Sequence, residues 1–276
     1  MIVHGFRPLR HVSFTVGLAI TLLLLATAAL SLVYTPRDPL EMSITERLQG
    51  PSAGHPLGTD QFGRDLLSRI MTGAVTSILV GVIAVGIGMG VGVLLGMLSG
   101  YFGGWLDEVF MRLMDAVQGF PAILSALLLT AVFKPSVTIS MVAIGVAFLP
   151  VFARLTRGSF LEFRDREFVL AARALGVGDA ALIGRHVLPN TLPPLIVQAT
   201  ISFPVAILAE AGLSYLGLGT QPPHPSWGLM LKEAQAFLGI NPGYALWPGS
   251  AIALTVLGLN LLGDGLRDVL DPKLSK

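Results

Sequence analysis

The sequence of 276 residues contains no cysteine, and only 13% of its residues are charged. Without cysteine the chain has no disulfide bond, thiolate metal site, iron–sulfur cluster or cysteine nucleophile. A soluble domain has about 25% charged residues, so about half of the usual charge is missing. Hydrophobic residues make up 53% of the chain, and the net charge of +1 leaves no positive excess for binding nucleic acid. We interpret the chain as an integral membrane protein.

Long runs without Asp, Glu, Lys or Arg predict where the chain crosses the membrane. A membrane-spanning helix needs about 20 mostly apolar residues. The runs are continuously apolar and do not alternate, which excludes the strands of a β-barrel. The sequence therefore predicts an all-α integral membrane protein with six transmembrane helices, near residues 12–33, 76–99, 110–133, 137–153, 195–219 and 245–264.

These spans divide the chain into four parts. We expect an N-terminal segment with an anchor helix, an extracytoplasmic linker with an interfacial helix, a core of five helices and a short tail, at residues 1–35, 36–75, 76–266 and 267–276. Gly63–Thr76 mixes charged and apolar residues, which predicts an amphipathic helix at the outer interface. The alternative is that this segment simply continues the second span.

The first span has an alternative interpretation as a cleaved signal peptide. Ala26-Thr27-Ala28 resembles a signal-peptidase site, and Arg7 and Arg10 precede the apolar segment. The apolar run continues past this site to Val33, which is longer than a usual signal-peptide core. We therefore favour a retained anchor helix.

The distribution of Lys and Arg predicts the orientation, because these residues collect on the cytoplasmic side of a membrane protein. With both ends inside, eleven Lys and Arg residues lie in cytoplasmic segments and six lie outside. Arg112 lies at the inner end of the third span. We expect the N-terminus and the C-terminus to be cytoplasmic.

The longest cytoplasmic loop, residues 154–191, is predicted to contain two short helices. Residues 166–175 are rich in Ala, Leu and Arg, which favour helix. Gly176 follows as a C-terminal cap, because glycine tolerates a left-handed backbone. Asp179 is expected to cap a second helix that stops before Pro189. The loop is either a solvated tether or a pair of helices that docks on a soluble partner.

Residues in this loop resemble the EAA loop of binding-protein-dependent ABC importer permeases. The resemblance rests on Ala171-Ala172, Gly176 and Leu188-Pro189, although Leu170 stands where the motif has Glu and His186 where it has Ile. Further segments resemble the dipeptide, oligopeptide and nickel subfamily, in particular its second permease subunit. They are His55–Asp60, Gly63-Arg64-Asp65, Ala209–Gly219, Pro225–Gly228 and Asn260–Asp264, followed by Leu270-Asp271-Pro272.

The resemblance implies a type I importer permease in the inner membrane that pairs with a homologous second permease. It also implies two cytoplasmic ATPase subunits, which bind ATP and Mg, and an extracytoplasmic substrate-binding protein. The chain itself has no Gly-x4-Gly-Lys-Ser/Thr phosphate loop and is expected to bind no cofactor. The residues that the resemblance assigns to ATPase coupling are Ala171, Ala172, Arg173, Gly176, Asp179, Leu188 and Pro189.

Four residues are candidates for the translocation path or for helix packing: Asp115, Pro121, Glu210 and Asn260. Glu210 is the only acid deep within an apolar run, and a central carboxylate costs about 2.5–3.5 kcal/mol, so it should face protein or water. Pro121 is expected to kink the third span. The spacings of Glu108 to Arg112 and of Arg112 to Asp115 allow pairing on a helix surface.

Glycines spaced by four residues give the second span one smooth face. Gly88, Gly92, Gly96 and Gly100 fall on this face, which favours close helix packing. A dinucleotide-binding loop is disfavoured because the segment lies within an apolar span and no strand precedes it.

The substrate class follows only from the resemblance, which implies di- or oligopeptides, with nickel chelates or glutathione as alternatives. The five histidines have no paired spacing, so we expect no metal site. Two other function classes are weighed: an ion-gradient secondary transporter, which usually shows inverted repeats, and an intramembrane enzyme, for which the sequence has no His-Glu-x-x-His pattern. Both are disfavoured.

Overall fold

The computed structural model describes residues 12–270. The predicted N-terminal segment with Arg7 and Arg10, and the tail with Lys273 and Lys276, fall mainly outside this range. The described chain is helical and contains no strand. Its helices are α1 Val12–Ser31, α2 Leu66–Phe102, α3 Gly104–Gln118, α4 Ala122–Phe133, α5 Val137–Phe163, α6 Glu167–Ala174, α7 Asp179–Ala181, α8 Leu188–Tyr215, α9 Trp227–Ala234 and α10 Gly243–Leu270. Short helical turns lie at Ile44–Glu46, Leu182–Val187 and Gln235–Phe237.

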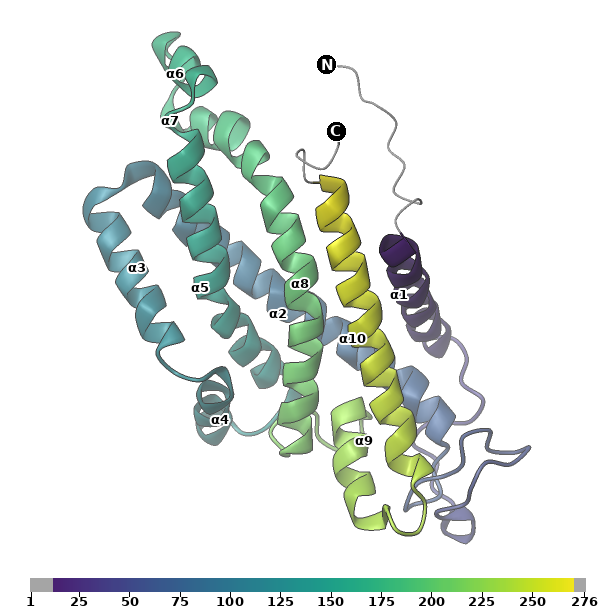
Figure 1. The fold of residues 1–276 in the computed structure, drawn as a ribbon. Helices are drawn as coiled ribbons and strands as arrows, with labels where there is room; N and C mark the ends of the chain where they lie inside the picture. The colour runs from purple at the N-terminus through teal and green to yellow at the C-terminus, as the bar shows by residue number, and fades with distance from the viewer. Residues whose placement is uncertain (1–11, 271–276) are drawn as a thin grey trace.

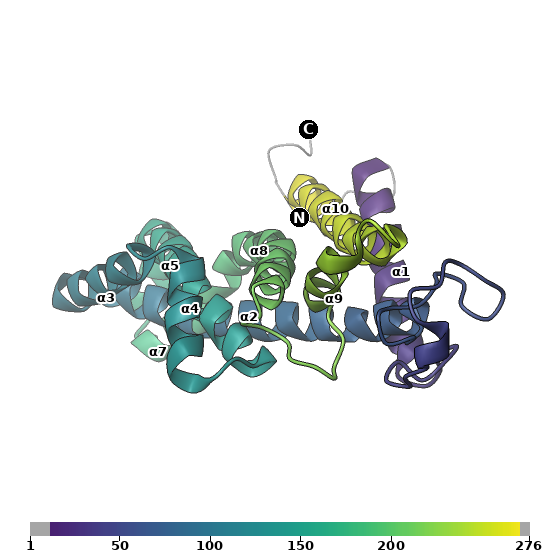
Figure 2. The same cartoon turned by 90° about the horizontal axis from the view of Figure 1, so that it is seen from below.

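The long helices form a bundle crossed by α2, which runs obliquely behind α5, α8 and α10 (Figure 1). Seen from below, α3 and α5 lie toward one end of α2, and α10 and α1 toward the other (Figure 2). The hairpin of α6 and α7 and the end of α10 lie at one end of the bundle, which we call the hairpin end. The segment between α1 and α2 lies with α9 at the opposite end (Figure 1).

Within the described part of the chain, five helices are long and apolar enough to cross a membrane, and a sixth span results if the bent pair α3 and α4 counts as one. The all-α prediction is confirmed, but the third span is not one kinked helix. It breaks between Gln118 and Ala122, and its two parts meet at 85°. Pro121 immediately precedes α4, where its missing N–H is not needed.

Two further boundaries differ from those expected. The prediction of a separate interfacial helix at 63–76 is wrong, because residues 66–75 are the first turns of the continuous α2, as the alternative interpretation held. The helix expected to stop before Pro189 instead continues into α8. A π-helical turn, Leu182–Val187, precedes Pro189 and widens the backbone, so the helix continues through the proline.

The predicted glycine face of α2 packs directly on α5. A Cβ atom on Gly88 would lie 2.5 Å from Phe148 Cβ, and one on Gly96 would lie 2.2 Å from the carbonyl oxygen of Ala153. Gly92 and Gly100 make equally close approaches to α5. The two backbones therefore meet at a distance that no larger residue allows.

A buried ionic cluster joins the start of α2 to α9 and α10. Arg64 Nε donates to Asp60 Oδ2 at 2.5 Å, and Arg69 Nη2 donates to Glu233 Oε2 at 3.0 Å. Tyr244 Oη donates to the same Glu233 oxygen at 3.1 Å. Arg69 has no exposed side-chain surface, so these partners replace the water that its charge has lost.

The glycine contact predicts a sharp difference between two substitutions on α2. Gly96→Ala should destabilise the chain by about 1–3 kcal/mol, because the new methyl group would overlap the backbone of α5. Gly90→Ala on the same helix is the matched control, since no atom lies within 4 Å of its Cβ position. Thermal unfolding in detergent measures both, and equal melting temperatures would contradict the packing.

The ionic cluster predicts that Glu233→Gln destabilises the chain by about 3 kcal/mol, because the buried charges of Arg64 and Arg69 would then share a single carboxylate, that of Asp60. The same substitution at Glu162, which pairs with Arg166 on the surface, should cost less than about 1 kcal/mol. Unfolding of the two variants side by side tests this. A Glu233→Gln chain as stable as Glu162→Gln would refute it.

Candidate functional site

The α6–α7 hairpin projects beyond the hairpin end of the bundle and rests on its own hydrophobic cluster (Figure 1). The buried members of this cluster come from the ends of α2 and α5, from α6 and from the π-helical turn: Tyr101, Phe160, Val169, Ala172, Leu182 and Val187. One face of α6 thus faces the bundle. The hairpin is packed against the bundle and is not a loose tether.

Gly176 ends α6 as the sequence predicts. Its φ of +82° is left-handed. Gly176 N–H donates to the carbonyl of Arg173 at 3.0 Å, and Val177 N–H donates to that of Ala172 at 3.2 Å. This pair of hydrogen bonds is a Schellman motif, which turns the chain sharply into α7.

Tyr101, at the end of α2, is the polar link between the hairpin and the bundle. Its hydroxyl donates to Asp179 Oδ1 and accepts from Arg173 Nη2 at 3.4 Å. The expected role of Asp179 as helix cap is wrong, because Gly178 occupies that position. The structure therefore brings Arg173 and Asp179 together on one tyrosine, which the sequence analysis did not foresee.

The outer face of α6 is exposed and largely apolar. Phe168 and Leu170 are both exposed, and Leu175 is 86% exposed. Ala171 lies on the same outer face, whereas its neighbour Ala172 is buried. Leu188 and Pro189 are the first residues of α8, which follows the hairpin directly in the chain. The hairpin thus combines a fixed inner face with an uncovered apolar outer face.

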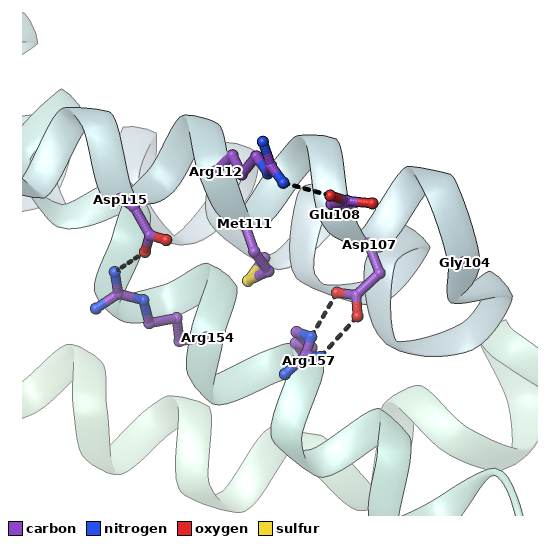
Figure 3. A pocket seen from close by; sticks show the side chains of 8 residues that line it. All are labelled: Gly104, Asp107, Glu108, Met111, Arg112, Asp115, Arg154 and Arg157. Carbon is purple, nitrogen blue, oxygen red and sulfur yellow. Dashed lines mark hydrogen bonds and ion pairs between the residues drawn. The ribbon is translucent and has the colours of Figure 1, made fainter.

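A second polar site is an open groove between α3 and α5, with a volume of about 470 Å³ (Figure 3). We call it the α3–α5 groove. Asp107 accepts two hydrogen bonds from Arg157, from Nε at 2.5 Å and Nη2 at 2.6 Å. Asp115 Oδ1 accepts from Arg154 Nη2 at 2.6 Å. The pairing of Asp115 with Arg112, which the spacing also allowed, is not formed.

The third pair of the groove lies wholly on α3. Arg112 Nη2 donates to Glu108 Oε1 at 2.5 Å, as the spacing of four residues predicts. Met111 lies between the pairs (Figure 3). With three carboxylates and three guanidinium groups, the groove has no net charge.

The four candidates for path or packing do not come together. Glu210 is buried within the bundle, where Oε1 accepts from Ser214 Oγ at 2.5 Å and Thr220 Oγ1 at 3.0 Å. Asn260 is exposed on α10, and Pro121 lies at the break before α4. Asp115 alone lines the α3–α5 groove.

Sequence reasoning missed the roles of Asp60, Arg69, Glu233 and Tyr244, and it missed α9 altogether. A signal for α9 was present, because Ser226 accepts a hydrogen bond from Leu229 N–H as a helix N-cap. Within residues 12–270, no group of three or more His, Asp or Glu side chains is placed to hold a metal ion.

Comparison with known proteins identifies the family. Residues 92–276 match the family described as "Binding-protein-dependent transport system inner membrane component". The dipeptide transport system permease protein DppC of Alkalihalophilus pseudofirmus is 44% identical over 94% of this chain and 85% of the relative. The glutathione transport system permease protein GsiD of Pectobacterium atrosepticum is 42% identical over 96% of this chain and 88% of the relative.

A solved structure of the MetNI methionine ABC transporter, in an inward-facing conformation, shares the fold. Its TM-score is 0.59 at 19% identity, with 75% of this chain and 96% of that chain covered. The family match and the curated relatives confirm the resemblance seen in the sequence, and the solved structure confirms the fold. The chain belongs to the family of binding-protein-dependent transport system inner membrane components, as a multi-pass inner-membrane permease subunit of an ABC importer.

Proposed function

We propose that this permease forms half of the translocation path for di- or oligopeptides or a related small solute, and that it couples to cytoplasmic ATPases through the α6–α7 hairpin. The observation that carries the coupling proposal is the uncovered apolar face of α6 on a well-anchored hairpin. An amphipathic helix commonly binds a partner by laying its apolar face into a groove. Phe168 and Leu175 are the anchors expected for such a groove.

The hairpin is also built to transmit force. Tyr101 ties it to α2, Phe160 ties it to α5, and the π-helical turn joins it directly to α8. A displacement of α6 therefore reaches three long helices through packed contacts. In this proposal Ala171, Ala172, Arg173, Gly176, Asp179, Leu188 and Pro189 shape and fix the hairpin.

The proposed assembly contains a homologous second permease, two ATPase subunits and an extracytoplasmic substrate-binding protein. ATP and Mg belong to the ATPase subunits, which carry out the hydrolysis. We place both chain ends in the cytoplasm. The proposal is supported by the arrangement in which the hairpin, the end of α10 and the first turn of α1 all lie toward the same end (Figure 1).

A peptide-like substrate is supported by the printed functions of the relatives, which include dipeptide and glutathione transport. Glutathione is itself a small peptide, so the same kind of translocation path can conduct both dipeptides and glutathione. Nickel chelates remain the alternative substrate of the same architecture.

The docking proposal predicts that Leu175→Asp weakens ATPase binding by about 2 kcal/mol, which corresponds to about thirtyfold. The side chain is exposed, so the fold should be unaffected. Leu238→Asp is the matched control, because this leucine is also exposed but lies beyond α9 at the opposite end. Pull-down of the tagged complex in gentle detergent, with quantified ATPase recovery, measures the effect. Full recovery with Leu175→Asp would overturn the proposal.

The importer proposal predicts ATP-dependent uptake by the purified complex in proteoliposomes. A labelled dipeptide or glutathione should accumulate when ATP and Mg are present on the hairpin side, and an ion gradient alone should drive no uptake. Nickel with a chelator, offered in the same assay, tests the alternative substrate. Uptake driven by an ion gradient without ATP would instead establish the secondary transporter.

A further inference from the structure

Two opposite faces of α3 differ in chemistry at the same depth. Asp107 and Asp115 lie on the face toward α5, where Arg157 and Arg154 bind them, and Val109 and Leu113 lie on the opposite face. The Asp115 side chain is 67% exposed, and Leu113 is 53% exposed. Because consecutive helical residues rise by about 1.5 Å, Leu113 and Asp115 lie within about 3 Å of one level.

In a multi-pass membrane protein, only one of these two faces can lie against lipid. Exposed charged groups are costly in hydrocarbon, whereas exposed apolar side chains are not. The face with Val109 and Leu113 therefore meets lipid. The face with Asp115, toward α5, must meet water or protein.

The charged face continues across the α3–α5 groove onto α5. Arg154 and Arg157 complete it, so every carboxylate has a guanidinium partner (Figure 3). Arg154 lies nine residues before the end of α5, or about 14 Å along the helix axis. The groove thus lies in the half of the bundle nearer the hairpin.

We propose that the α3–α5 groove is a wall of the water-filled inner half of the translocation path, where its charge pairs contact the ionised ends of a zwitterionic solute. A solute that carries an ammonium and a carboxylate can exchange partners with such pairs without adding net charge to the groove. A purely anionic or cationic solute finds no excess of opposite charge there. This inference rests on the proposed function for the translocation path and for the identity of the solute.

Single cysteines test which face meets water, because the native chain contains none. Met111→Cys and Asp115→Cys represent the face toward the groove, and Val109→Cys and Leu113→Cys are the matched positions on the apolar face. Each variant is treated with a charged, membrane-impermeant thiol reagent, as full complex in inside-out vesicles. The charged-face cysteines should react at least about tenfold faster, because a thiol in hydrocarbon stays protonated and dry.

Equal labelling of both faces would overturn the inference, as would protection of positions 111 and 115 together with disulfide cross-linking to the second permease. The latter result would make the groove a subunit interface. Labelling requires neither ATP nor substrate. Its outcome is therefore separate from that of the ATP-dependence experiment.

Reversal of one ion pair tests solute contact. The double variant Asp115→Arg with Arg154→Asp keeps the salt bridge between α3 and α5 but exchanges its ends. If the pair only holds the helices together, transport kinetics should match those of the native protein. Contact with the solute predicts native complex recovery and maximal rate with a KM for dipeptide raised about tenfold. An unchanged KM would overturn this part of the proposal.

Discussion

The close approach of α2 to α5 is the constraint on which the rest of the subunit depends. Glycine at every fourth position removes the side chains that would separate the two backbones, and Phe148 and Phe152 of α5 fill the space that results. Attraction between helices in lipid comes from such packing and not from the hydrophobic effect. Because α2 crosses the bundle, it also packs on α8, which in turn packs on α10 (Figure 2).

The same contact connects the hairpin to the membrane-spanning part. Gly100 approaches Phe160 where α2 and α5 reach the hairpin end, and the next residue, Tyr101, carries the hydroxyl that binds Asp179. Packing and hydrogen bonding are therefore continuous from the hairpin into the bundle. A movement of the hairpin must be shared by both helices, since neither can shift alone without overlap at the glycines.

Much of the fold could be predicted because helix positions and helix ends depend on neighbouring residues in the sequence. Apolar runs located the long helices, and Gly176 located the end of α6 through its left-handed backbone. The missed features depend on distant partners. Arg69 is one of the charged residues that led us to predict an interfacial helix. Its counter-ion, Glu233, lies 164 residues away in the chain, so nothing in the sequence indicates that Arg69 is buried. The pairing of Asp115 with Arg154 was equally invisible, because it requires α3 and α5 to be placed first.

The two ends of the subunit are held by ionic interactions of very different strength. At the end with α9, Arg64 and Arg69 are buried, and separating them from Asp60 and Glu233 would cost about 3–5 kcal/mol. In the α3–α5 groove, the Asp115–Arg154 pair is largely exposed, so its loss costs at most about 1 kcal/mol. Water can replace one partner in the groove but not in the buried cluster. Motion within this subunit should therefore concentrate at the hairpin end, with the α9 end acting as the fixed support.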